Sequence, residues 1–223
     1  MSWVRVPLDP PILIFQKSPI RDFCYSGIVK PISANQMIAE FLKAELHSSR
    51  FREGSLKALR MCGYEEVLLE HPDCNNPIQN KKRAEVLNLC RGWPDTDLFM
   101  NFPSDTMWFS TTILLGELKE SYRLKSSYNM TDIERSLKAT GSKVMEGSAV
   151  ENINNNLILE IRKKIEVGEQ LPPIILVAVE REGKKVLLEG HSRSVAYSTF
   201  EQLDFDIPAI IGISNNMNDW AYF

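Results

Sequence analysis

The sequence has few residues that could hold a metal ion or form disulfide bonds. Its 223 residues include four cysteines and three histidines, and no two cysteines have CxxC spacing. Zinc sites and disulfide frameworks need closely spaced ligands or paired cysteines. The sequence therefore predicts neither kind of site, and reduced thiols in a cytoplasmic protein are the expected state.

The sequence also lacks a long apolar run and an excess of basic charge. A membrane-spanning helix needs about 18 or more consecutive apolar residues, and no such run is present. The proline-broken N-terminus does not have the features of a secretion signal. The net charge is −3, whereas a protein that binds DNA without sequence preference usually carries a basic face. Charge therefore gives no support to a nucleic-acid partner.

What is present is enough apolar material for a core, in two regions of different pattern. Hydrophobic residues make up 43% of the chain and charged residues 25%, which is typical of a globular protein. Residues 1–104 are expected to be mainly helical and are a possible contact region for a protein partner; an oligomer is also possible. Residues 105–213 are expected to form an α+β domain, and 214–223 a polar tail with an aromatic end.

The first region has clear helix signals after a proline-rich start. Short strand-like runs occur at 12–15 and 25–29. Ser33, with Gln36 three residues later, is a capping-box pattern that predicts a helix start. A second helix is expected over 78–91, with Lys81, Lys82 and Arg83 on its solvent side and its end at Gly92.

The second region alternates strands and helices. Strands are expected over 107–115, 174–179, 185–188 and 207–213, and helices over 116–125, from Thr131 to near Gly141, and over 149–167. This order predicts a small mixed sheet with helices. The positions assigned to its core are Val150, Ile153, Leu157, Ile161, Ile174 and Leu176.

Within this region, residues 186–200 predict a buried strand, a tight turn and a helix. Gly190 lets the backbone approach a ligand closely, because it has no Cβ. The helix that follows has free N–H groups at its start, which favour an anion. Arg193, in its first turn, can bind phosphate or carboxylate through two N–H groups. The pattern indicates a phosphate site, although a surface turn with an exposed arginine is the plainer interpretation.

The segment 188–193, Leu-Glu-Gly-His-Ser-Arg, together with the upstream Leu-Pro-Pro-Ile-Ile-Leu-Val of 171–177, resembles the ParB/sulfiredoxin superfamily. The resemblance covers about 145–213 and implies that Gly190, His191, Ser192 and Arg193 bind nucleotide phosphates. A cysteine directly after the glycine would be needed for sulfiredoxin chemistry, and His191 stands there. ParB proteins that partition chromosomes carry a helix-turn-helix after this domain; only ten residues follow the last expected strand here, so recognition of that type is not expected.

The expected function is therefore that of a nucleotide-dependent phosphotransferase or nucleotide hydrolase that uses ATP or CTP with Mg²⁺. The alternatives are a ParB-like DNA-binding protein or nuclease, an ADP-ribosylating toxin or defence protein that uses NAD, and a non-catalytic protein whose pocket serves regulated assembly with a partner.

Three residues are the candidates for catalysis. His191 titrates near neutrality and can act as acid or base, or it can merely brace the turn. Glu189 can orient His191 or bind Mg²⁺, or be an ordinary turn carboxylate. Glu117, like Glu120 beside it, is a candidate by position after the first strand of the domain, because phosphoryl transfer uses carboxylates near the acceptor.

Overall fold

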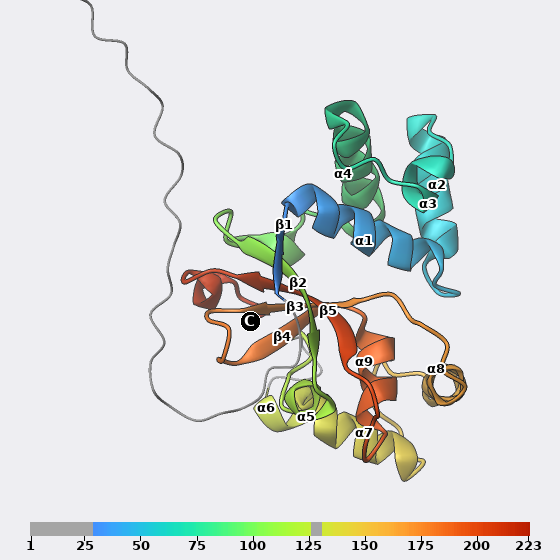
Figure 1. The fold of residues 1–223 in the computed structure, drawn as a ribbon, viewed down its shortest axis with the longest axis vertical. Helices are drawn as coiled ribbons and strands as arrows, with labels where there is room; N and C mark the ends of the chain where they lie inside the picture. Colours follow the sequence, from blue (N-terminus) through green and yellow to red (C-terminus); the bar gives the residue numbers. More distant parts are fainter. Residues whose placement is uncertain (1–28, 126–130) are drawn as a thin grey trace, which may run out of the picture.

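The computed structural model describes residues 29–125 and 131–223. These form a five-stranded mixed sheet with helices on both faces (Figure 1). The prediction of a mixed α+β fold is confirmed. The strand-like runs at 12–15 and over most of 25–29 lie outside the described residues. Within the described part, no helix is both long and apolar enough to cross a membrane.

The elements follow one another in an order that begins with a short strand and four helices. These are β1 (Lys30–Ile32), α1 (Ala34–Leu46), α2 (Arg52–Cys62), α3 (Val67–Glu70) and α4 (Pro77–Arg91), followed by the 3₁₀ turn η1 (Asp97–Phe99). The remaining elements are β2 (Met107–Ile113), α5 (Leu115–Lys119), α6 (Asp132–Arg135), α7 (Leu137–Met145), α8 (Asn155–Glu166), β3 (Ile174–Ala178), β4 (Lys185–Glu189), α9 (His191–Ser198), β5 (Ile207–Ile213) and η2 (Met217–Asp219).

The sheet has the strand order β1-β2-β5-β3-β4. Only β3 and β5 run parallel, and the other neighbours are antiparallel. β1 comes from the N-terminal region and pairs with β2, so the two regions predicted from the sequence share one sheet.

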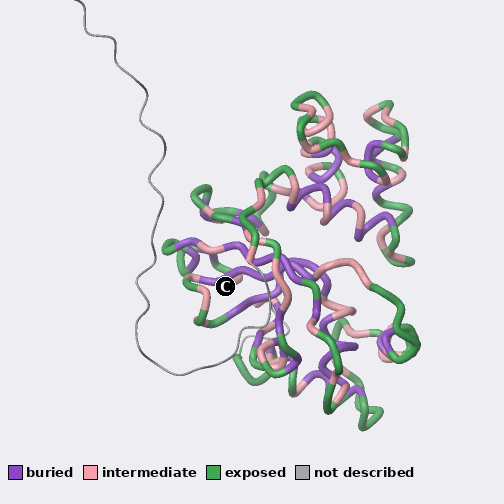
Figure 2. Tube along the Cα trace, in the orientation of Figure 1, coloured by how far each residue is buried: buried purple, intermediate pink, exposed green. Residues whose placement is uncertain are grey.

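The central strands are apolar at almost every position because helices cover both faces. Side chains alternate between the faces of a strand. Ile175 and Val177 pack into the core under α1–α4, and Ile174 and Leu176 pack into the core under α5–α9. Figure 2 shows these strands as the continuous buried centre of the molecule.

The C-terminal aromatic residues belong to the first of these cores. Trp220 is 1% exposed, and its indole N–H donates to the Leu98 carbonyl at 2.7 Å. It also makes an edge-on contact with Phe102. The tail therefore packs back on the body, as the sequence allowed.

Several expected elements have different bounds. The helix expected from Thr131 to near Gly141 is two helices, because Ser136 has non-helical dihedrals and its hydroxyl caps α7. Gly141 does not end a helix but lies inside α7 against Ser198, where a Cβ would be 2.4 Å from the serine Oγ.

The amphipathic helix begins later than the expected 149–167. Asn152 has a left-handed φ of 61°, and the Asn154 side chain accepts the Leu157 N–H as the N-cap of α8. Asparagine side chains compete for backbone groups and so favour turns and caps. Residues before 154 therefore form an irregular segment instead of another helical turn.

Arg83 is also not on the solvent side of its helix, as expected, but fully buried. Its guanidinium donates to the carbonyls of Leu68 and Asp73 and to the side chains of Gln79 and Asn80. Arg83 therefore ties the loop before α4 to that helix. Gly92, in contrast, ends α4 with a left-handed φ of 76°, as predicted.

Candidate functional site

The turn between β4 and α9 has the strand–turn–helix form predicted from the sequence. Gly190 lies between the two elements with φ 89° and ψ 24°. This left-handed conformation is costly for residues with a Cβ, and a Cβ here would also lie 2.9 Å from Ile174 Cγ2. Glycine is therefore required by the backbone and by the close neighbouring strand, and it brings the start of α9 against β3.

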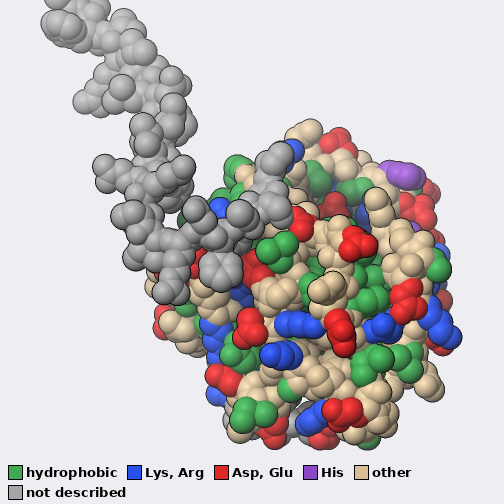
Figure 3. All heavy atoms as spheres, turned by 60° about the horizontal axis from the view of Figure 1, so that its bottom comes forward, with side chains coloured by type: hydrophobic (Ala, Val, Ile, Leu, Met, Phe, Trp, Pro, Cys, Tyr) green, Lys and Arg blue, Asp and Glu red, His purple; other side chains and the backbone are tan. Residues whose placement is uncertain are grey.

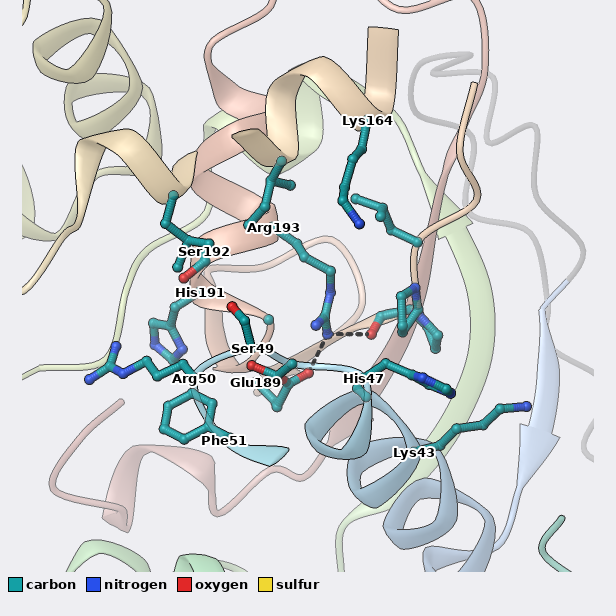
Figure 4. Close-up of a pocket in the computed structure, with 18 of the residues that line it drawn as sticks. Lys43, His47, Ser49, Arg50, Phe51, Lys164, Glu189, His191, Ser192 and Arg193 are labelled. Atoms are coloured by element: carbon teal, nitrogen blue, oxygen red, sulfur yellow. Dashed lines mark hydrogen bonds and ion pairs between the residues drawn. The ribbon is translucent and has the colours of Figure 1, made fainter. Parts of the chain in front are cut away.

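Arg193 is held by the turn itself. Its Nη2 donates to Glu189 Oε2 at 2.5 Å and to the Pro173 carbonyl at 3.2 Å (Figure 4). The two side chains are 12% and 8% exposed. Part of the donor set that we expected to bind phosphate is thus used to join the turn to β3, and the carboxylate of Glu189 is already paired.

A cavity of about 1150 Å³ opens beside this turn. One wall comes from the end of α1 and the loop after it, a second from α8, and a third from residues 169–173 and the turn. In Figure 4, Arg50, His191 and Ser192 lie on one side of Arg193, and Lys43, His47 and Lys164 lie on the other. Cationic side chains thus reach this space from segments far apart in the sequence.

Four arginines surround His191. Burial, and then the positive charges of Arg123, Arg91, Arg193 and Arg50 in that order of importance, together lower the pKa of this imidazole to about 3. In the ligand-free protein His191 is therefore neutral at physiological pH. It can accept a proton or donate one hydrogen bond, but it does not carry the charge of an imidazolium.

Two of these arginines make no ion pair with another described residue. Arg193 pairs with Glu189, and Arg91 lies 3.8 Å from Glu45. Among the ion pairs between described residues, none includes Arg50 or Arg123. Arg123 is only 8% exposed, and burial lowers the pKa of its guanidinium. A buried cation without an ion-pair partner is unfavourable, so Arg123 favours the binding of an anion in the cavity.

The α8 wall of the cavity contains apolar side chains beside the charged Glu160 and Lys164. Ile153, Leu157 and Ile161 line it, together with Leu171 and Pro172 from the segment before β3. The sequence assigned the three α8-side residues to the core, but they are only half buried. Ile153 and Ile161 pack on the core beneath, and all three residues line the cavity. A cavity with a cationic end and an apolar wall suits a ligand that has both characters.

The structure brings together most of the site residues expected from the sequence. Glu189, Gly190, His191, Ser192 and Arg193 all line the cavity. Glu117 does not: it lies on α5, where its carboxylate pairs with Lys185 at 3.0 Å.

Sequence reasoning missed Arg50, Arg91 and Arg123. Each is a single arginine with no local motif around it, in the loop after α1, at the end of α4 and after α5, respectively. No pattern along the chain could have indicated that they converge.

The described residues contain no cluster of three His, Cys, Asp or Glu side chains that could hold a metal ion by themselves. Mg²⁺ in nucleotide sites is usually held by one or two carboxylates and by the phosphates of the ligand. Of the cavity carboxylates, those of Glu169 and Glu189 are paired with Lys164 and Arg193. Glu40 and Glu160 also line the cavity.

In comparisons with known proteins, no protein-family model, no curated protein and no solved structure matches this chain.

Proposed function

We propose that this protein binds a nucleoside di- or triphosphate, ATP or CTP with Mg²⁺, in the cavity beside Gly190, and that it transfers or hydrolyses a phosphoryl group. The observation that carries the proposal is the buried Arg123, which makes no ion pair with another described residue, together with the exposed Arg50, in a cavity that also contains the start of α9. The resemblance of residues 188–193 to the ParB/sulfiredoxin phosphate turn supports the same assignment.

The polyphosphate would lie at the arginine end. Guanidinium groups bind phosphate oxygens through pairs of N–H groups, and the start of a helix adds backbone donors and a favourable dipole. Two uncompensated charges, one of them buried, favour a ligand with at least two negative charges close together. The apolar wall of Ile153, Leu157 and Ile161 would contact the base and sugar.

His191 is the group that would move a proton. In the free protein its low pKa makes the imidazole a weak base, but bound phosphates would offset the surrounding arginines and raise that pKa. The imidazole could then accept a proton from the hydroxyl of an acceptor or from water as that oxygen attacks phosphorus. Glu189 would keep Arg193 in place, and Ser192 would donate its hydroxyl to a phosphate oxygen.

Calorimetry with ATP, CTP, GTP and NAD, each with Mg²⁺, tests the proposal directly. We expect one of the triphosphates to bind, and Arg123→Gln and Arg50→Gln to weaken it by about tenfold or more each, since each removes a charge-assisted contact. The matched control is Arg60→Gln, because Arg60 is on the surface of α2 and makes only a 3.9 Å ion pair.

Phosphate release from the bound nucleotide, followed with His191→Asn, tests the chemical step. We expect this variant to keep binding and lose turnover. Absence of binding by every triphosphate would overturn the proposal. Binding of NAD alone would point instead to a pyrophosphate site for an NAD-using enzyme.

A nucleic-acid function has less support. On the face drawn in Figure 3, lysine and arginine side chains alternate with aspartate and glutamate and form no continuous basic patch. Salt-sensitive binding to DNA depends on such a patch. A mobility-shift assay at low salt is the corresponding measurement, and we expect no shift.

A further inference from the structure

Glu45 is a buried carboxylate whose negative charge has little support from hydrogen bonds or nearby cations. It lies near the C-terminal end of α1 and is 1% exposed. Its Oε1 has no hydrogen-bond partner among the described residues, and its nearest cation, Arg91 Nε, is 3.8 Å from Oε2. Burial of a charged group without close partners costs free energy. A neutral residue of the same size would serve folding better, so this carboxylate calls for a functional explanation.

Charged and titratable groups from several neighbouring segments act on Glu45. Arg91 and the Cys90 thiol lie on α4, Arg50 on the loop after α1, Glu189 on β4 and Arg193 on α9. Burial raises the pKa of Glu45, Arg91 lowers it, Glu189 raises it, and the resulting pKa is about 7. Glu45 thus lies close to the balance between its charged and neutral forms at physiological pH.

Glu45 acts on the cavity through Arg91. Arg91 is the last residue of α4 and lines the cavity, whereas Glu45 lies behind it. The guanidinium of Arg91 is also 4.2 Å from the ring centroid of Phe51 and 5.9 Å from that of Phe41. The two rings and the carboxylate together hold the guanidinium at the wall of the cavity.

We infer that Glu45 is a positioning residue that couples ligand binding to proton uptake. As a carboxylate it holds Arg91 in the free protein. When an anionic ligand becomes the partner of Arg91, Glu45 takes up one proton from solvent, and no bond to the ligand forms or breaks. This inference rests on the proposed function, because it requires an anion in the cavity.

Proton uptake by Glu45 is expected because two negative charges close together repel each other. A phosphate ligand near Glu45 disfavours its carboxylate form and raises its pKa above the value in the free protein. Affinity is then highest below about pH 7 and falls as pH rises from there through the pKa of the complex. Each unit by which binding raises the pKa corresponds to about a tenfold change in affinity.

The test is calorimetry with inorganic pyrophosphate, which does not depend on recognition of a base. Binding is measured between pH 6 and 8.5 in buffers that differ in ionisation enthalpy, for the wild type and for Glu45→Gln. Pyrophosphate itself titrates in this range, and the difference between the two proteins removes that contribution. The matched control is Glu65→Gln, an exposed residue that does not line the cavity.

We expect the wild type and Glu65→Gln to take up more protons than Glu45→Gln between pH 7 and 8, by up to one proton per ligand. Glu45→Gln should still bind, with an affinity that varies less with pH. Equal proton uptake in all three proteins would overturn the inference while leaving the phosphate site intact. No binding of pyrophosphate or of any nucleotide by the wild type would instead overturn the proposed function.

A second measurement does not depend on the variant. In the wild type labelled with ¹³C at the glutamate carboxyl carbons, NMR should show one carboxyl that titrates near pH 7 and moves to higher pH when pyrophosphate is added. If no carboxyl moves in this way, the inference is wrong even if Glu45→Gln fails to fold.

Discussion

Arg193 and Glu189 face each other across the turn that begins α9, with Nη2 2.5 Å from Oε2. Both side chains are largely buried, and the same guanidinium donates to the Pro173 carbonyl. The arginine that the sequence singles out as a phosphate ligand is therefore also part of the framework of the turn. The charge that remains to attract a ligand comes from Arg50 and Arg123, which have no carboxylate partners among the described residues.

Removal of Arg193 alone should destabilise the protein strongly. Arg193→Met leaves the Glu189 carboxylate buried and unpaired, and we expect a loss of about 3–5 kcal/mol in the free energy of unfolding. The double variant Arg193→Met with Glu189→Gln should recover much of that loss, because no uncompensated charge remains. Urea unfolding of the two single variants and the double variant measures the coupling, and additive losses would show that the pair does not act as a unit.

Three glycines should respond differently to alanine. At Gly190 the φ is left-handed and an added Cβ would lie 2.9 Å from Ile174. At Gly147 the φ is also left-handed, at 73°, but an added Cβ would have no atom within 4 Å. Gly54→Ala lies in α2, also with nothing within 4 Å, and should stabilise by about 0.5–1 kcal/mol.

We therefore expect Gly190→Ala to lower the free energy of unfolding most. Gly147→Ala should lower it by about 1 kcal/mol, the cost of the backbone conformation alone, and Gly54→Ala should raise it. Thermal unfolding of the three variants checks this order. Equal effects at Gly190 and Gly147 would mean that β3 moves to accept the added methyl group.

The free protein should lose stability on acidification through His191. The folded pKa of about 3 lies below the ordinary value of 6.5, so the unfolded chain binds a proton that the folded protein does not. The contribution of this residue is fully present above pH 6.5 and is lost as pH falls from 6.5 toward 3, by at most about 1.4 kcal/mol per pH unit.

His191→Gln should reduce this slope. Unfolding at a series of pH values measures the effect, and NMR titration of the imidazole should show its pKa rising when nucleotide is bound, because an anion offsets the surrounding arginines. An imidazole that titrates near 6.5 in the free protein would contradict the arrangement of charges described above.

Arg123 should be a residue at which function and stability conflict. Arg123→Met removes a buried cation that has no ion-pair partner among the described residues, and we expect it to stabilise the protein by about 1–3 kcal/mol. The exposed control Arg60→Met should change stability by no more than about 0.5 kcal/mol. Urea unfolding in the absence of ligand makes the comparison. A loss of stability in Arg123→Met would indicate that the guanidinium serves the fold.

Local patterns in the sequence were sufficient for the elements that form the turn. The apolar run at 174–178, the hairpin, Gly190 and the helix after it depend on side-chain alternation, on a residue that tolerates positive φ and on apolar spacing, all of which can be read within 30 residues. The helix starts at Ser33 and Thr131 were predicted for the same reason, and both carry a capping box. Patterns failed where asparagine and serine side chains redirected the backbone, as at Asn154 and Ser136.

The sequence by itself therefore determined the strand–turn–helix unit around Gly190 and the residues that it presents. Only the tertiary structure decided that this unit lies in a cavity with Arg50, Arg91 and Arg123 around His191, and with the Glu45 carboxylate buried behind Arg91. The physical reason is that these residues come from segments with no local signal. Their positions are set by how α1 and α4 pack on one face of the sheet while α8 and α9 pack on the other.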